Sequence, residues 1–224
     1  MNSHRKAGDK ETPMGNSLRV LRAVGGRAVV LGDDVNTDLI IAGRYCRMAE
    51  PAELARHVLE GTEWEGKVSP GDIIIAGRNM GIGSSREQAP LALKGAGVRA
   101  IVAESFGRIF FRNSVNIGLP VMVVPGVRGR VRSGERVLLD FEKGTLEVPA
   151  ERLVLHGEPL PPFMTEILRD GGLVPHLRRR MGFWTRSGGA RALEKRRGNR
   201  AEFTTTHPVP GLTRDAGDHS HGGA

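Results

Sequence analysis

The chain has 224 residues, of which 39% are hydrophobic and only 4% aromatic, and its formal net charge is +8. This length allows one sizeable core with tails, and the shortage of aromatic residues means that the core must rest on Val, Ile, Leu and Ala. No apolar run approaches the ~20 residues of a membrane-spanning helix, and a single cysteine excludes an internal disulfide and a self-contained iron–sulfur or cysteine-rich zinc site.

The N-terminal part begins with a polar segment, residues 1–17, which is expected to be a disordered leader. It lacks the apolar stretch of a secretory signal, which favours a cytoplasmic location. A strand is predicted at Gly26–Leu31, and the turn-forming residues of Gly32–Asp38 predict a loop after it. Glu50–Glu60 has the pattern of a surface helix with its apolar residues on one face.

The middle of the chain alternates strands with helices. Strands are predicted at Gly71–Gly77, Val98–Ala103 and Pro120–Val124, and helices at Glu87–Lys94 and Arg108–Ile117. Three consecutive isoleucines indicate that the first strand is buried, and glycines directly after both helices predict their ends. This order of elements predicts a parallel α/β core with right-handed connections.

The pattern changes after this core. Strands at Glu135–Phe141 and Thr145–Val148, joined by a Glu-Lys-Gly turn, predict a hairpin. A helix is predicted at about residues 163–169, and Gly171 and Gly172 are expected to end it.

The basic charge is concentrated at the end of the chain. Residues 176–224 contain ten Lys and Arg against four Asp and Glu, which is +6 of the total +8. The folded domain is expected over residues 18–178, and residues 179–224 are expected to form a disordered basic tail. A non-catalytic module that binds nucleic acid or an acidic partner through this tail is a less favoured function, because few aromatic residues accompany the charges.

The most informative segment is the turn Gly81–Glu87, between a predicted strand and a predicted helix. Such a turn directs free backbone N–H groups and the positive end of the helix dipole to one place, where an anion can bind. Arg86 adds a planar guanidinium suited to a carboxylate, and Ser84 or Ser85 can either cap the helix or take part in chemistry. The segment lacks the lysine of a P-loop and the third glycine of a dinucleotide-binding turn, so a small carboxylate is favoured over a nucleotide.

Five segments carry a resemblance to a known family. They are Gly32–Ile41, Gly77–Pro90, Glu104–Asn113, Asn116–Pro120 and Ile167–Leu173. Over residues 18–178 and in the same order, they resemble the motifs of the aconitase-type hydro-lyases, and specifically of the 3-isopropylmalate dehydratase small-subunit family. The resemblance implies an α/β fold, namely a swivelling β/β/α domain of the aconitase small-subunit type with disordered tails at both ends.

The resemblance also implies a heteromeric hydro-lyase of leucine biosynthesis, active only with a large subunit in a heterodimer or heterotetramer. Its reaction would interconvert 2-isopropylmalate and 3-isopropylmalate by dehydration and rehydration through an alkene. The large subunit would hold a [4Fe-4S] cluster on its own cysteines, with one iron acting as a Lewis acid. Cys46 is the single cysteine of this chain, so this chain cannot supply the cluster. No other cofactor or metal is expected on it.

The resemblance assigns roles to four residues. Ser84 matches the catalytic base, used as an alkoxide, and Ser85 and Arg86 match contacts to the substrate carboxylates. A serine hydroxyl is too weak a base in water, so this role requires N–H groups, the helix end and Arg86 to stabilise the anion. Arg47 falls where an apolar residue is typical of isopropylmalate enzymes and an arginine of homoaconitase-type enzymes.

Arg47 therefore leaves the substrate open. It can meet an extra carboxylate of the substrate, pair with Glu50 at i+3, or extend into solvent, since a desolvated guanidinium facing an isopropyl group would lack a partner. Isopropylmalate is the first expectation, and homoaconitate or another substituted malate is the alternative.

Overall fold

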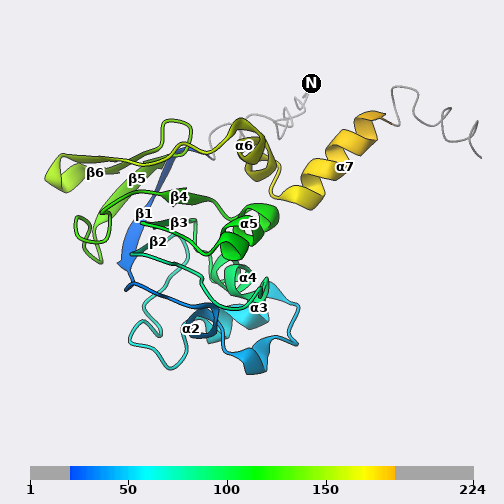
Figure 1. Ribbon diagram of the computed structural model, residues 1–224, viewed down its shortest axis with the longest axis horizontal. Helices are drawn as coiled ribbons and strands as arrows, with labels where there is room; N and C mark the ends of the chain where they lie inside the picture. The colour runs from blue at the N-terminus through cyan, green and yellow to red at the C-terminus, as the bar shows by residue number, and fades with distance from the viewer. Residues whose placement is uncertain (1–20, 185–224) are drawn as a thin grey trace, which may run out of the picture. The chain divides into compact units, whose positions relative to one another are not determined.

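The computed structural model describes residues 21–184, and the predicted leader and the tail from residue 185 onward lie outside the described residues. A seven-stranded sheet with the order β4-β3-β2-β1-β5-β6-β7 forms the centre of the fold (Figure 1). The strands are β1 (Arg22–Val30), β2 (Ile73–Ala76), β3 (Ala100–Ala103), β4 (Val121–Val123), β5 (Arg136–Asp140), β6 (Thr145–Val148) and β7 (Leu153–His156). The predicted α/β class is confirmed.

Strand β1 joins the parallel and antiparallel halves of this sheet. Its second half pairs in parallel with β2, with Ala28 opposite Ile73, and β3 and β4 continue in parallel. Its first half pairs antiparallel with β5, and β6 and β7 follow antiparallel. The predicted parallel core and hairpin are confirmed. Strand β7 is not predicted by the sequence, because it lies at the edge of the sheet and has no fully buried side chain.

The helices lie beside the parallel strands, where α4 packs against α3 and α5, and α5 packs against α6 (Figure 1). The α-helices are α2 (Thr37–Ile40), α3 (Pro51–Leu54), α4 (Gln88–Gly95), α5 (Arg108–Ile117), α6 (Pro162–Arg169) and α7 (Leu173–Trp184), and the 3-10 turns are η1 (Gly43–Tyr45), η2 (Ala55–His57) and η3 (Pro149–Glu151). The core is aliphatic, as the composition predicts, and every side chain of β2 and β3 is buried. Within residues 21–184, no helix is long and apolar enough to cross a membrane.

The helix expected over Glu50–Glu60 is wrong in its length, since only α3 and η2 form there. Val58 returns to extended backbone and Leu59 adopts a left-handed conformation with φ +58°. This bend buries Leu59 completely and lets its N–H donate to the Ile40 carbonyl at 3.0 Å. Burial of one leucine thus overrides the helical periodicity.

The boundary expected after residue 178 does not coincide with the end of regular structure. Helix α6 ends before Gly171 as predicted, but α7 follows and continues through residues 179–184, which the sequence assigns to the tail. The Asp170 carboxylate at the end of α6 fixes the start of α7. It lies 2.6 Å from His176 Nδ1 and 2.9 Å from Arg179 Nη1.

The backbone of residues 77–83 passes too close to its neighbours to carry side chains at key points. A Cβ at Gly81 would lie 2.1 Å from Phe110 Cγ, and Gly81 has φ +75°. The Gly81 N–H donates to the Val35 carbonyl at 2.7 Å, and the Thr37 N–H donates to the Ile82 carbonyl at 2.9 Å. Glycine is therefore required for this segment to contact α5 and the loop after β1 together.

The replacement Gly81→Ala is expected to lower the free energy of unfolding by about 3 kcal/mol, because it adds left-handed backbone strain to overpacking. Gly66→Ala is the matched control, since Gly66 has φ +69° but nothing within 4 Å of an added Cβ. Backbone strain alone predicts a loss of about 1 kcal/mol for the control. Urea unfolding followed by circular dichroism measures both, and equal losses would contradict the packing argument.

Candidate functional site

Three loops meet at the carboxyl ends of β1, β2 and β3, the edge at which parallel sheets commonly bind ligands. They comprise residues 32–38, 77–87 and 104–107. Isolated bridges between Asn36 and Ile82 and between Met80 and Phe106 continue the strand order beyond the sheet. Segments far apart in the sequence are thereby placed side by side.

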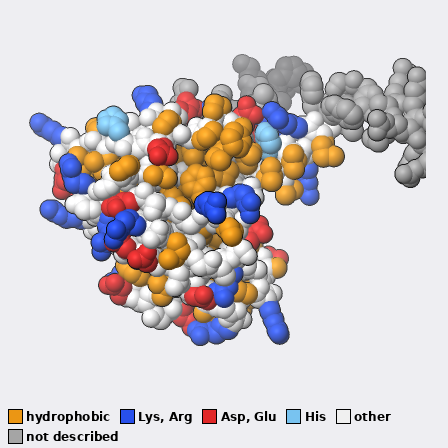
Figure 2. All heavy atoms as spheres, viewed as in Figure 1, with side chains coloured by type: hydrophobic (Ala, Val, Ile, Leu, Met, Phe, Trp, Pro, Cys, Tyr) orange, Lys and Arg blue, Asp and Glu red, His pale blue; other side chains and the backbone are white. Residues whose placement is uncertain are grey.

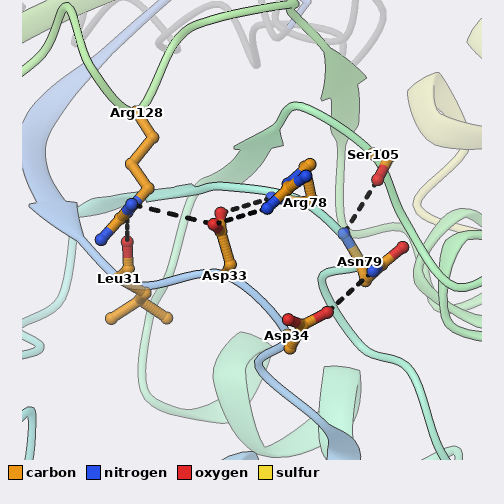
Figure 3. Close-up of polar contacts among 7 residues, drawn as sticks. All are labelled: Leu31, Asp33, Asp34, Arg78, Asn79, Ser105 and Arg128. Atoms are coloured by element: carbon orange, nitrogen blue, oxygen red, sulfur yellow. Dashed lines mark hydrogen bonds and ion pairs between the residues drawn. The ribbon is translucent and has the colours of Figure 1, made fainter.

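Asp33 ties the first two loops together (Figure 3). Its Oδ1 accepts the Arg78 N–H at 2.9 Å, and its Oδ2 lies 3.4 Å from Arg78 Nη2 and 3.9 Å from Arg128 Nη1. The hydrogen bond from the Arg78 backbone, helped by the charges of Arg128 and Arg78, lowers the pKa of Asp33 against the opposing effect of burial. The carboxylate therefore acts as a charged brace between the loops.

Asn79 connects all three loops (Figure 3). Its Nδ2 donates to Asp34 Oδ1 at 2.7 Å, and its N–H donates to Ser105 Oγ at 2.8 Å. Asn79 and Asp34 both have left-handed backbones, a conformation that Asn and Asp tolerate better than most residues. A pocket of about 710 Å³ opens beside this brace and is lined in part by Trp64, but not by Ser84.

The serines of the turn are exposed, and neither caps the helix that follows. Helix α4 begins at Gln88, and its N-cap residue Glu87 makes no side-chain capping bond. Ser84 Oγ instead lies 3.1 Å from the hydroxyl oxygen of Thr37, a residue that is 1% exposed. Of the two roles that the sequence leaves open for these serines, helix capping is wrong.

The turn presents a row of backbone donors. Within the described part of the chain, the N–H groups of residues 83–87 donate no hydrogen bond to another protein group. They directly precede α4, whose first turn has further N–H groups without helical partners. Pro90 lies in that first turn, where the missing N–H of proline breaks no helical hydrogen bond. Donors and the positive helix end together make a site suited to an anion.

Arg86 is held beside these donors by Asp38. Its Nη1 donates to the Asp38 carboxylate, and this hydrogen bond raises the pKa of Arg86 further above its ordinary value. The guanidinium faces the backbone of Gly43, where an added Cβ would lie 3.3 Å from Nη2. Arg86 is therefore charged and oriented by Asp38, and the absence of a side chain at Gly43 lets the backbone approach its guanidinium.

Arg47 is exposed and follows η1. The residue before it, Cys46, is bound to helix α4, because Gln88 Nε2 donates to the Cys46 carbonyl at 3.1 Å. Among residues 21–184, no ion pair joins Arg47 to Glu50 or to another carboxylate. The predicted pair of Arg47 with Glu50 is thus not formed. Of the possibilities expected from the sequence, contact of the guanidinium with solvent or with a substrate carboxylate is left.

Two residues near the turn have contacts to which the sequence analysis gives no role. Thr37 contacts Ser84, and Asp38 contacts Arg86. Both lie inside the Gly32–Ile41 motif, so the signal is present in the sequence, but the spacing does not indicate that the two loops touch. Among the described residues, no group of three or more His, Cys, Asp or Glu side chains could hold a metal ion.

Comparison with known proteins gives consistent matches. The family described as aconitase C-terminal domain matches residues 49–125. The 3-isopropylmalate dehydratase small subunit of Halothermothrix orenii is 46% identical over 155 residues, which cover 68% of this chain and 94% of that protein. The isopropylmalate/citramalate isomerase small subunit of Methanocaldococcus jannaschii is 46% identical over 158 residues, 70% of this chain and 94% of that protein.

A solved structure agrees with these matches. The crystal structure of 3-isopropylmalate dehydratase from Methanocaldococcus jannaschii has a TM-score of 0.69 and 39% sequence identity, and covers 74% of this chain and 99% of its own. The swivelling-domain fold expected from the sequence motifs is confirmed by this similarity.

The Asp33 brace predicts a pH-dependent stability. Folding lowers the Asp33 pKa below its ordinary value of 3.8, so the stabilisation is present above that value and is lost as the pH falls through the lowered folded value. Asp33→Asn is therefore expected to destabilise the chain at neutral pH, and its deficit relative to wild type should shrink in acid. Urea unfolding of both proteins from neutral to acidic pH measures this, and a deficit independent of pH would contradict it.

Proposed function

The chain belongs to the 3-isopropylmalate dehydratase small-subunit family of hydro-lyases, and on this premise we propose that, with a large subunit, it interconverts 2-isopropylmalate and 3-isopropylmalate. The observation that carries the proposal is the Gly81–Glu87 turn. There, an exposed serine, a row of backbone donors and a charged guanidinium lie next to one another. This set of groups suits a dicarboxylate that must lose a proton from carbon.

We assign Ser84 as the base in this reaction. Its oxygen takes the proton from the substrate carbon, the electrons of that C–H bond form the alkene, and the hydroxyl leaves from the adjacent carbon. The reverse sequence on the neighbouring carbon gives the isomer. A serine alkoxide needs strong stabilisation, and the N–H groups of residues 83–87 with the positive end of α4 supply it.

Thr37 supports this assignment. Its buried hydroxyl lies 3.1 Å from Ser84 Oγ, close enough to donate a hydrogen bond once Ser84 is ionised. Hydrogen bonds to the charged form of a group favour that form. The same contact favours one rotamer of Ser84, the one that places its hydroxyl oxygen next to the Thr37 hydroxyl.

Arg86 and Ser85 are proposed to bind the substrate carboxylates. A guanidinium binds a carboxylate through two parallel hydrogen bonds, and Asp38 keeps this one oriented on the surface of the turn. Ser85 is exposed beside it and adds a hydroxyl donor. The substrate is thereby fixed at its charged end, which leaves its carbon chain to meet Ser84.

The large subunit is proposed to complete the site and to carry the [4Fe-4S] cluster, since Cys46 is the only cysteine of the sequence and cannot hold one. The cluster would supply Lewis-acid assistance to the departing hydroxyl.

Figure 2 shows apolar side chains gathered over α5 and α6, where Ile109 is 40% and Phe163 is 58% exposed. Patches of this kind are typical of protein contacts, and α5 begins beside the turn, so we propose this face for the large subunit, in the cytoplasm.

A second substrate class is supported by Arg47. Its exposed guanidinium has no carboxylate partner among the described residues and could bind the extra carboxylate of homoaconitate or another substituted malate. One relative is named an isopropylmalate/citramalate isomerase small subunit, which supports keeping a second substituted malate as a candidate substrate. Isopropylmalate stays the first proposal because several relatives are named for it.

Ser84→Ala is expected to lower kcat of the assembled enzyme by about 100-fold or more, as loss of a catalytic base does, while the subunits still co-purify. Ser69→Ala, which changes an exposed serine outside the turn, is the matched control and should keep normal turnover. Near-normal activity of the Ser84 variant would contradict the assignment.

The substrate proposal is tested by assaying the assembled enzyme with 2-isopropylmalate and with homoaconitate. Isopropylmalate is expected to give the higher kcat/KM, and Arg47→Leu should preserve that activity while weakening any turnover of the tricarboxylate. Exclusive turnover of the tricarboxylate by the wild-type enzyme would overturn the first proposal in favour of the second.

A further inference from the structure

Four side chains around η1 form a closed set of contacts, which we call the Tyr45 cluster. Its members are Arg44, Tyr45, His57 and Glu60. The rings of Tyr45 and His57 stack with 3.8 Å between their centroids and 13° between their planes. The Arg44 guanidinium carbon lies 4.8 Å from the centre of the Tyr45 ring.

Glu60 closes the cluster by using both of its oxygens. Oε1 accepts from Arg44 Nη2 at 2.8 Å, and Oε2 lies 2.9 Å from His57 Nδ1. The Tyr45 hydroxyl, then the His57 ring and the Arg44 guanidinium, lower the pKa of Glu60. The carboxylate is therefore charged at neutral pH and joins two segments that are 16 residues apart.

The cluster ties η1 to η2 and to the bend that follows it. A single exposed ion pair contributes little to stability, but here each contact restrains the geometry of the next. The aromatic stack adds a directional contact between the two rings. Arg44 and Tyr45 are adjacent in the chain, so two consecutive residues of η1 are both held by contacts with the segment His57–Glu60.

The same loop also contacts the turn and helix α4. Gln88, the first residue of α4, donates to the Cys46 carbonyl at 3.1 Å, and Gly43 lies against the Arg86 guanidinium. The loop Gly43–Met48 therefore contributes two residues to the Tyr45 cluster and also contacts the turn and α4, and it carries Arg47. Loss of a contact in the cluster is therefore expected to loosen this loop beside Arg86.

We propose that His57, Glu60 and Gln88 are positioning residues that fix the Gly43–Met48 loop beside Arg86 and thereby set substrate preference. The fixing of the loop is a property of this chain alone. Its effect on substrate rests on the proposed function, so the two are tested by separate measurements.

The first measurement uses Cys46, the single cysteine of the sequence, which is half-buried within the loop. The rate at which its thiol reacts with 5,5′-dithiobis(2-nitrobenzoic acid) in the full chain reports how often the loop opens. His57→Leu, Glu60→Gln and Gln88→Leu are each expected to raise this rate about fivefold, the factor that corresponds to roughly 1 kcal/mol of opening free energy. Glu53→Gln, which changes an exposed carboxylate of α3 outside the cluster, should leave it unchanged.

Unchanged thiol rates in these three variants would overturn the proposal. Circular dichroism and urea unfolding establish that each variant is folded. Glu60→Gln preserves the size of the side chain, so its thiol rate decides the test if His57→Leu does not fold.

The second measurement is made on the enzyme assembled with its large subunit. The variants are expected to raise KM about fivefold and to change the ratio of kcat/KM between isopropylmalate and homoaconitate, while kcat stays within about twofold, because Ser84 and Arg86 are untouched. Loosening of the loop with unchanged KM and unchanged substrate ratio would overturn the role in substrate preference. If the wild-type enzyme acts on neither substrate, the proposed function fails, and the thiol rates still decide whether the loop is fixed.

Discussion

The site depends on the absence of side chains where three loops cross. Gly81 lies so close to Phe110 that a Cβ there would be 2.1 Å from the ring, and a Cβ at Gly107 would be 2.7 Å from the Gly81 carbonyl. This close approach lets the Val35 carbonyl accept from the Gly81 N–H and the Ile82 carbonyl accept from the Thr37 N–H, which joins the two loops. The contacts of Thr37 with Ser84 and of Asp38 with Arg86 follow from it, because both pairs lie on the loops that these bonds align.

Under the proposed mechanism, this arrangement needs a second chain to complete the site. Ser84 and Ser85 are exposed, and an alkoxide in contact with bulk water would be protonated at neutral pH. A partner that covers the turn would exclude this water and strengthen every electrostatic contact to the substrate. The apolar surface over α5 and α6 lies on the helix that begins next to the turn, which suits contact with such a partner (Figure 2).

The sequence predicts the elements of the parallel core and the turn because their signals are local. The isoleucines of β2, the glycines after helices and the Gly-Ser-Ser-Arg segment each depend on near neighbours. The shortened helix after Glu50 and strand β7 depend instead on partners farther away in the chain, such as Ile40 for Leu59. The start of α7 depends on the side-chain contact of Asp170 with His176, which helical periodicity does not indicate. The contacts of Thr37 with Ser84 and of Asp38 with Arg86 join residues 47 and 48 positions apart, so the sequence does not predict them, although both residues stand in an identified motif.

The proposed function requires this chain to supply one half of a hydro-lyase active site. Its most direct test is to purify the full chain and a cluster-bearing large subunit separately and to follow the alkene formed from 3-isopropylmalate by its ultraviolet absorbance. Each subunit alone should be inactive, and mixing them should give turnover that saturates with the concentration of this chain. Full turnover by the large subunit alone, or none after assembly is demonstrated, would contradict the claim.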